Sequence, residues 1–441
     1  MRKHVARTVL ASVLALTSIA SAQDATFRGM GYSGMGASLV GSRADALSPD
    51  GLVATGGDDT DMGTLVASWD EFAFFPEFLR DPDGNFTPGR GVAVSELGLV
   101  TVGGWNTFRD GTFVRLSMAW QLGQLGVELQ PLPDALPLSG TYTVVGDLNG
   151  HGSLAVGVSF DEARRRQPVS WDPASGAVDR LPLLQGRTGG QANRISTDGR
   201  IIFGSQFGGP GGVDRIVLWT DGVPQAADAT LPDGYADFTI LGISPDASVV
   251  TGTLLPIDYD PFTNPAKPAV WREDTGIEIL DTIGPAGFRL IDDAVNDASE
   301  HGGLMVGTVG VFVVGGPYAA AVWFEDGSVR LLQEWLVDEF GLFEAGEWRG
   351  LLEATSISDD GTIIVGYGIN QFGIKEAFRV TLPRLGCEVD FDEDGSLTIF
   401  DFLAFQNLFD DRHPRADMDG DGQFTLFDFL AFQTQFDAGC E

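Results

Sequence analysis

The sequence predicts an all-β main domain, a seven-bladed β-propeller of four-stranded blades, followed by a small α-helical module. Three observations support this. Tryptophans recur at nearly constant spacing, a turn containing Ser and Asp-Gly lies upstream of most of them, and one short segment near the end of the chain occurs twice. A repeat of about fifty residues suits a propeller, because each blade is one unit that buries its faces only against its neighbours.

The aromatic period defines the units. The intervals between successive tryptophans are 48 to 52 residues, and a phenylalanine continues the series after 55. The positions are Trp69, Trp120, Trp171, Trp219, Trp271, Trp323 and Phe378. Most follow small or apolar residues, as in Ala321-Val322-Trp323. We expect these aromatic side chains to form the cores between blades and not a ligand site.

The segments between these positions have the signature of strands. Short runs rich in β-branched residues, such as Thr362–Val365, are bounded by turn residues, as in Ser358-Asp359-Asp360-Gly361. With 59 Gly and 22 Pro in the chain, long helices have little room. Four short strands fit each unit: one into the Asp-Gly turn, one out of it, one ending at the tryptophan, and one after a second turn.

These units resemble the HAF-type extracellular repeat over roughly residues 40–383. The match is clearest from Ala354 to Gly368, followed by Glu376-Ala377-Phe378, whereas Ser95-Glu96-Leu97-Gly98 lacks the aspartate. The resemblance implies an extracellular β-rich protein. It carries no catalytic residues over to this chain.

A segment near the C-terminus is duplicated: Asp390–Gln406 and Asp417–Gln433 have similar sequences. Each copy places oxygen side chains at loop positions one, three, five, nine and twelve, with Gly395 or Gly422 at position six, which is the ligand spacing of a calcium loop. Ser396 and Gln423, at position seven, would contribute backbone carbonyls. The predicted ligands of two calcium ions are Asp390, Asp392, Asp394, Ser396, Thr398 and Asp401, and Asp417, Asp419, Asp421, Gln423, Thr425 and Asp428.

Each loop is followed by a predicted apolar helix. The apolar positions at helical spacing are Phe402, Leu403, Phe405 and Phe409 in the first copy and Phe429, Leu430, Phe432 and Phe436 in the second. A core this small usually needs a metal or a disulfide. The chain's two cysteines, Cys387 and Cys440, lie just outside the duplicated pair, where a disulfide would join the ends of the module.

Residues 386–441 resemble a type I dockerin, most closely the variant bracketed by Gly-Cys at both ends. The resemblance implies a cohesin-like protein partner, contacted partly through loop positions ten and eleven. Those positions are Ile399, Phe400, Leu426 and Phe427, where cellulosomal dockerins often carry small hydroxyl residues. The alternative is a calcium-stabilised spacer that has no partner.

The N-terminus has the features of a secretory signal. Basic residues Arg2, Lys3 and Arg7 precede the mostly apolar run Thr8–Ile19, and Ala20-Ser21-Ala22 is a small-residue cleavage site. We therefore predict a signal peptide over residues 1–22, a propeller over 23–383 and a dockerin-like domain over 384–441, in a protein that is secreted to the extracellular space or cell surface without membrane insertion.

Charge and composition narrow the function. With 62 acidic and 27 basic side chains the net charge is −35, which disfavours nucleic acids and anionic membranes as partners. Only His151, His301 and His413 follow the signal, so a Ser-His-Asp triad or a His/Cys metal site is poorly supplied. We predict a non-catalytic binding or scaffold protein whose propeller takes a glycan or a protein. The alternative is a polysaccharide-acting hydrolase or lyase that uses propeller carboxylates.

The last unit ends without room for its outermost strand before Cys387. The segment Thr26–Tyr32 belongs to no complete unit of its own. We predict that it pairs beside the strand containing Phe378 and closes the ring, because closure removes two exposed strand edges.

Overall fold

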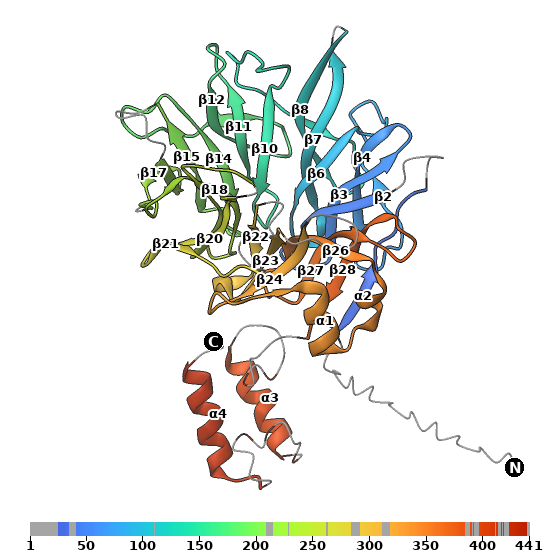
Figure 1. The fold of residues 1–441 in the computed structure, drawn as a ribbon, viewed down its shortest axis with the longest axis vertical. Helices are drawn as coiled ribbons and strands as arrows, with labels where there is room; N and C mark the ends of the chain where they lie inside the picture. Colours follow the sequence, from blue (N-terminus) through green and yellow to red (C-terminus); the bar gives the residue numbers. More distant parts are fainter. Residues whose placement is uncertain are drawn as a thin grey trace, which may run out of the picture.

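The computed structural model describes residues 25–34, 41–109, 111–208, 215–227, 229–261, 263–283, 292–310, 318–383, 397–410 and 423–438, and the single residues 389, 391, 412, 416 and 418. Within these ranges the strands form seven four-stranded sheets arranged as the blades of a propeller (Figure 1). The predicted fold class is confirmed.

In the first six blades the strands follow the chain from the axis outward. Blade 1 consists of β2 Gly41–Leu47, β3 Val53–Thr60, β4 Gly63–Asp70 and β5 Glu77–Phe78. Blade 2 consists of β6 Gly89–Val94, β7 Val100–Arg109, β8 Thr112–Gln121 and β9 Val127–Leu129. Blade 3 consists of β10 Thr143–Leu148, β11 Ala155–Phe160, β12 Arg166–Trp171 and β13 Val178–Arg180. Blade 4 consists of β14 Gly189–Ile195, β15 Ile201–Phe207, β16 Arg215–Thr220 and β17 Val223–Ala226. Blade 5 consists of β18 Tyr235–Ile243, β19 Val249–Pro256, β20 Lys267–Arg272 and β21 Gly276–Ile279. Blade 6 consists of β22 Ala294–Ala298, β23 Leu304–Val309, β24 Ala319–Phe324 and β25 Val329–Leu331.

Blade 7 is made from both ends of the propeller chain. Its strand order is β1-β28-β27-β26, where β26 is Gly350–Ile357, β27 is Ile363–Ile369, β28 is Lys375–Thr381 and β1 is Thr26–Gly29. β1 runs antiparallel to β28, with Phe27 opposite Val380 and Gly29 opposite Phe378. The predicted closure is therefore confirmed: β1 covers the outer edge of β28 and becomes the outermost strand of the blade.

The Ser-Xaa-Asp-Gly segments are structural turns between the first and second strands of a blade. The Ser48 hydroxyl donates to the Asp50 carboxylate at 2.6 Å and accepts the backbone N–H of Val53 at 2.9 Å. Gly51 has a φ of 73°, the left-handed region that glycine enters without a steric penalty. The same serine contacts recur at Ser196, Ser244 and Ser358. The turns thus serve local structure, because their side chains are used within the turn itself.

The six tryptophans of the repeat lie in the interfaces between blades, with at most 4% of their surface exposed. Each sits opposite the residue six positions after the turn serine or Asn149, as Trp323 sits opposite Met305 and Trp171 opposite Ala155. In blade 7 the equivalent residue Ile364 pairs with Val380, and Phe378 pairs with Gly366. The assignment of Phe378 to the tryptophan position was therefore wrong by two residues. Phe378 is still fully buried, because its ring occupies the space beside Gly366, which has no Cβ.

Two helices interrupt the β architecture between blades 6 and 7, which the sequence pattern did not predict. Helix α1 (Leu332–Phe340) ends at Gly341, which has a left-handed conformation and donates its backbone N–H to the carbonyls of Leu336 and Val337 in the last turn. Helix α2 (Phe343–Glu347) follows directly. Trp335 and Leu336 of α1 are buried in the same hydrophobic cluster as Phe27 of β1. The helices thus cover the interface between blades 6 and 7, next to β1 (Figure 1).

The C-terminal module contains two helices where they were predicted, α3 (Ile399–Asp410) and α4 (Leu426–Ala438). Phe405 and Phe432, equivalent residues of the two copies, stack with ring centroids 4.4 Å apart and form the centre of one hydrophobic cluster. Leu403 and Leu430 were expected in this core but are 46% and 48% exposed. The reason is helical phase: the buried face follows 402, 405 and 409, whereas 403 lies on the opposite side.

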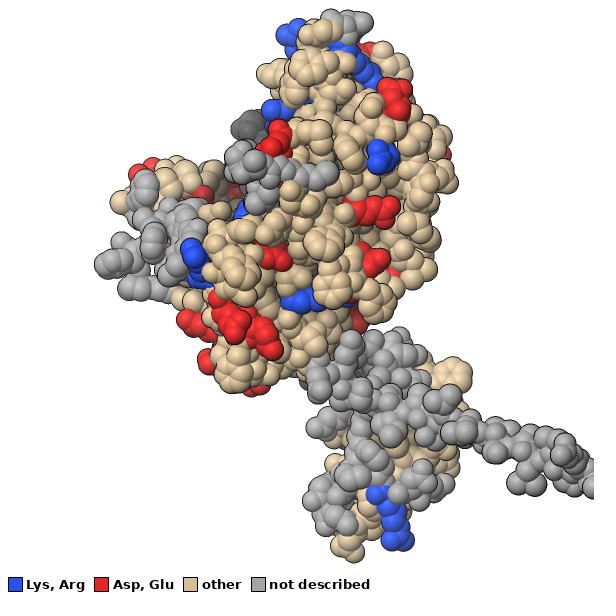
Figure 2. All heavy atoms as spheres, turned by 90° about the vertical axis from the view of Figure 1, so that its right-hand side faces the viewer, with Lys and Arg blue, Asp and Glu red and all other residues tan. Residues whose placement is uncertain are grey.

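The surface has no single dominant charge on the side shown in Figure 2, where acidic and basic side chains lie scattered among uncharged residues. No helix within the described ranges has the length and apolar character required to span a bilayer.

Candidate functional site

Two regions of the chain carry the candidate sites, the C-terminal helix pair and the axis of the propeller. In the helix pair, all four residues predicted to contact a partner lie on the surface. Their exposed fractions are 64% for Ile399, 62% for Phe400, 70% for Leu426 and 65% for Phe427. Leu403 and Leu430 lie one helical turn further along the same faces. We call these six residues the duplicated apolar surface.

Five of the twelve predicted calcium ligands fall within the described residues: Thr398, Asp401, Gln423, Thr425 and Asp428. The remaining seven, Asp390, Asp392, Asp394, Ser396, Asp417, Asp419 and Asp421, lie outside them, as do Cys387 and Cys440. The described residues alone contain no group of three acidic, histidine or cysteine side chains placed to hold a metal.

The two described position-twelve residues have matching environments. Asp401 and Asp428 are fully buried in the first turn of their helices. A carboxylate oxygen of each accepts the backbone N–H three residues earlier, that of Thr398 or Thr425, at 2.7 Å. A buried carboxylate requires strong partners, and all-oxygen ligation is what calcium prefers. The described donors therefore fit a hard divalent cation at the same place in both copies.

The axis of the propeller encloses a cavity of about 120 Å³ that is lined by the first strand of every blade. Each of these strands contains a β-bulge three residues before the turn serine or its equivalent, Asn149. A bulge re-aims the side chains beside it and leaves a backbone group unpaired. In blades 3, 6 and 7 the residue after the bulge, Asp147, Asp297 or Ser356, accepts a hydrogen bond from the next blade.

Two buried aspartates use this arrangement to join neighbouring blades. The Asp147 carboxylate accepts the backbone N–H of Ile195 in the next blade at 2.9 Å. The Asp297 carboxylate accepts the hydroxyl of Ser356 at 2.7 Å and the backbone N–H of Ile357 at 3.1 Å. Burial raises the pKa of Asp297 to about 6, although these hydrogen bonds oppose the rise. Both carboxylates therefore act as structural acceptors.

A belt of backbone hydrogen bonds surrounds one end of the cavity. The residue after each turn serine, or after Asn149, donates its N–H to the equivalent carbonyl of the next blade. The bonds run from Glu96 to Gly150, Gly150 to Thr197, Thr197 to Pro245, Glu300 to Asp359 and Asp359 to Pro49, with lengths of 2.8–3.1 Å. The belt is interrupted at Pro49 and Pro245, because proline has no N–H to donate.

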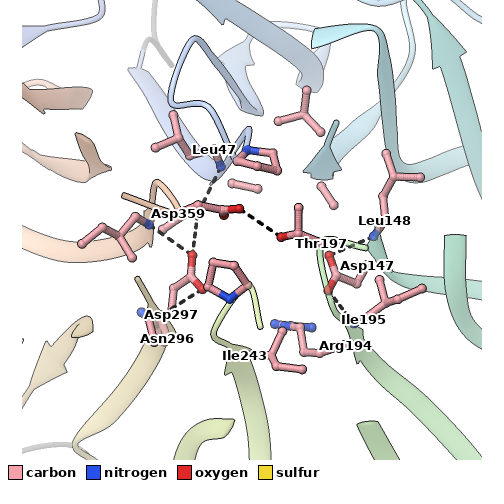
Figure 3. A pocket seen from close by; sticks show the side chains of 18 of the residues that line it. Leu47, Asp147, Leu148, Arg194, Ile195, Thr197, Ile243, Asn296, Asp297 and Asp359 are labelled. Carbon is pink, nitrogen blue, oxygen red and sulfur yellow. Dashed lines mark hydrogen bonds between the residues drawn. The ribbon is translucent and has the colours of Figure 1, made fainter. Parts of the chain in front are cut away.

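One side-chain contact crosses the axis inside this belt. The Thr197 hydroxyl of blade 4 donates to the Asp359 carboxylate of blade 7 at 3.1 Å (Figure 3). Burial raises the pKa of Asp359 to about 7; the bond to Thr197 opposes the rise, and the charges of Asp297, Glu300 and Asp360 add to it. The contact closes the cavity on the side of the Asp-Gly turns.

At blades 7 and 1 the cavity is bordered by a charged network. The Arg43 guanidinium pairs with Asp45 and with Glu353, the latter at 3.3 Å, and lies over the ring of Tyr367 at 4.5 Å from its centroid. The second carboxylate oxygen of Glu353 accepts the Asn296 amide at 3.2 Å. These groups join three blades across the closing interface.

Sequence reasoning missed these axial residues. Asp147 and Asp297 stand two positions before Asn149 and Ser299, a signal that aligning the units on their turns would have shown. The contact between Thr197 and Asp359 leaves no sequence signal, because 162 residues separate the partners.

No family model matches the chain, and no curated protein matches it. Solved structures resemble it in fold. A putative TolB from Agrobacterium tumefaciens is 16% identical, with a TM-score of 0.39, over 57% of this chain and 86% of that one. The β-propeller domain of the trilobed protease from Pyrococcus furiosus is 12% identical, with a TM-score of 0.46, over 77% of this chain and 95% of that one.

Proposed function

We propose that this is a secreted, non-catalytic binding or scaffold protein, with a propeller displayed through a calcium-dependent C-terminal docking module. The observation that carries the proposal is the duplicated apolar surface. A soluble module gains nothing by exposing six large apolar side chains, and such patches mark interaction sites. Their occurrence at equivalent positions in both copies indicates one common use.

The apolar side chains of this surface indicate which kind of surface a partner would need. Each half presents one phenyl ring and two aliphatic side chains at the start of a helix, next to the buried carboxylate of Asp401 or Asp428. A complementary partner would offer an apolar patch that excludes water from these rings. The resemblance of residues 386–441 to a dockerin is our reason to propose a cohesin-like domain as that partner.

Calcium would order the surface and take no part in the contact itself. Ile399 and Leu426 immediately follow position nine of their loops, so the ion that organises the loop also fixes the helix start. Thr398, Asp401, Thr425 and Asp428 would be among the residues that hold the two ions. The role of the two ions would be structural.

In this proposal the propeller is the domain that the C-terminal module displays. Its axial carboxylates Asp147 and Asp297 are occupied as acceptors between blades, and the turn aspartate Asp50 accepts from Ser48 in its own turn and from the next blade. A binding role for a glycan or a protein on the propeller surface is consistent with this use of the acidic groups.

The test measures binding of the full chain to purified cohesin-type domains by surface plasmon resonance, with calcium and with a chelator. We expect binding that requires calcium. The double variant Phe400→Ser/Phe427→Ser should bind at least 100-fold more weakly. The matched control is Phe343→Ser/Phe372→Ser, which makes the same change at two exposed propeller positions and should bind like the parent. An absence of cohesin binding, or equal binding by the double variant, would contradict the proposal.

A further inference from the structure

A buried arginine lies at the interface where the propeller closes. Arg379 of β28 is only 6% exposed. It occupies the position just before the tryptophan equivalent, where blades 2, 5 and 6 carry Ala119, Val270 and Val322. Its neighbour Ala377, on the same face of the strand, packs in the cluster of blade 1. Arg379 therefore faces blade 1 from a position that is apolar in those three blades.

A second arginine lies directly opposite. Arg28 of β1 is the cross-strand partner of Arg379. Side chains at such positions have Cβ atoms about 5 Å apart, and like charges there are destabilising. Arg28 is held in place from blade 1: it donates to the carbonyls of Glu71 and Ala73, the latter at 2.7 Å, and lies 5.7 Å from the ring centroid of Phe74.

The guanidinium of Arg379 makes no hydrogen bond or ion pair within the described part of the chain, although its backbone lies in the β28 ladder. Burial lowers its pKa to about 10, and the charge of Arg28 lowers it further, while Glu71 and Asp50 oppose the shift. The Asp50 carboxylate is already used, since one oxygen accepts the Ser48 hydroxyl and the other accepts the backbone N–H of Leu97 at 2.6 Å. A buried guanidinium without an acceptor is costly.

The same interface lacks a second acceptor. Trp120, Trp171, Trp219 and Trp323 each donate the indole N–H to a carbonyl just beyond the outer strand of the preceding blade. The indole N–H of Trp69 is buried without a partner. The equivalent carbonyl is that of Gly31, which accepts the Ser42 hydroxyl at 2.6 Å instead. The closing interface thus holds one buried donor without a partner, the indole N–H of Trp69, and the guanidinium of Arg379, which reaches no acceptor among the described residues.

We propose that this interface binds a small oxyanion between Arg379 and Arg28. A carboxylate, sulfate or phosphate would neutralise the like-charged pair and accept charge-assisted hydrogen bonds from the planar guanidinium groups. The anion would join blade 7 to blade 1, so its binding would stabilise the closed ring. The overall charge of −35 makes a general attraction of anions improbable, so the effect is specific to this position.

The test is the melting temperature of the full chain, with calcium present, in increasing sodium acetate, sulfate or phosphate, against sodium chloride at equal ionic strength. We expect a saturable increase for at least one oxyanion, and the comparison identifies whether the site prefers a carboxylate or a tetrahedral anion. Arg379→Leu should remove this increase, and Arg379→Lys should retain part of it. Glu71→Gln should strengthen binding severalfold, because it removes a competing negative charge.

Arg200→Leu is the matched control, since it makes the same change at an exposed arginine that pairs with Asp221. It should respond to anions like the parent. Equal responses of the parent and Arg379→Leu, or no oxyanion response of the parent, would overturn the proposal. Calorimetric titration of Arg379→Lys with the preferred anion provides a second measurement that does not depend on tolerance of leucine at this position.

Discussion

The propeller and the C-terminal helix pair differ in how much apolar surface each can bury. In the propeller, each blade packs large side chains such as Trp219 and Trp323 into interfaces from which solvent is excluded. In the helix pair a single cluster centred on Phe405 and Phe432 contains the core, and rings beside it, such as Phe402 and Phe429, are only partly buried. We therefore expect the propeller to be stable by itself, and we expect the small module to need the predicted ions and disulfide.

The two regions also treat polar groups differently. At the axis of the propeller, polar atoms find partners in neighbouring blades: the carboxylates of Asp147 and Asp297 accept from backbone N–H and hydroxyl donors of the next blade. The helix pair buries one carboxylate in each copy, at Asp401 and Asp428, both of which are predicted metal ligands. The comparison shows which region should respond to metal removal and which to changes at the strand interfaces.

The largest effect is expected from opening the ring. Deletion of residues 23–33 removes β1, its pairing with β28 and the buried ring of Phe27, which contacts Trp348 edge to face. Loss of the phenyl ring alone costs about 3–5 kcal/mol. We expect the whole propeller to melt cooperatively at a lower temperature in scanning calorimetry. An unchanged propeller transition after the deletion would contradict the closure observed here, and Phe27→Ala should reproduce most of the loss.

Calcium removal should separate the two regions. A ligand at 100 times its Kd stabilises by about 2.7 kcal/mol per site, so two ions contribute about 5 kcal/mol. With a chelator, the helical circular dichroism signal of the module should melt earlier while the propeller transition stays unchanged. Calorimetric titration should find two ions in the parent and one in Asp390→Ala or Asp417→Ala. Uptake of a single ion by the parent would refute the duplicated-loop prediction.

The cysteines are expected to contribute slightly less. Closure of a loop of about fifty residues by a Cys387–Cys440 disulfide is worth roughly 3–4 kcal/mol in the chain-entropy model. Protein isolated from the culture medium should give no reaction with a thiol reagent until it is denatured and reduced. Two reactive thiols in the native protein would exclude the disulfide, and Cys387→Ser/Cys440→Ser should lower the stability of the module without affecting the propeller.

The smallest effect concerns the axis and depends on pH. Because the folded-state pKa of Asp359 is raised to about 7, its contribution to stability is full below the ordinary aspartate range and is lost as pH rises toward and through 7. Asp359→Asn removes this titration and retains an acceptor for Thr197. We expect it to stabilise the propeller by about 2 kcal/mol at pH 8, and by less at pH 5. Urea unfolding at both pH values measures the difference, and an equal effect at both would be inconsistent with a raised pKa.

Much of the fold followed from local patterns. The tryptophan period and the Ser-Asp-Gly turns predicted the blades, because a turn whose side chains bond within five residues forms in the same way in each repeat. The unfilled strand position after the last unit predicted the role of Thr26–Gly29. The apolar runs after the two loops predicted α3 and α4. Ile399, Phe400, Leu426 and Phe427 are exposed, and their assignment to a partner surface stays a prediction.

Other features depend on distances in space that no sequence pattern records. Strand register placed Val380, and not Phe378, at the tryptophan position, since register is decided by the pairing with Ile364 and Gly366. Helices α1 and α2 were missed because their burial against blades 6 and 7 outweighs a weak local pattern. The helical phase that exposes Leu403 was set by which rings of the two copies could stack.

The sequence by itself determined the repeat, its turns, the need for a closing strand and the duplicated loop-helix units, because each arises from side chains close together in the chain. Only the tertiary structure decided the belt around the axis, the contact between Thr197 and Asp359, and the apposition of Arg28 and Arg379. Those partners are separated by 162 residues in one case and lie at opposite ends of the propeller chain in the other. Closing the ring of blades is the physical event that brings them together.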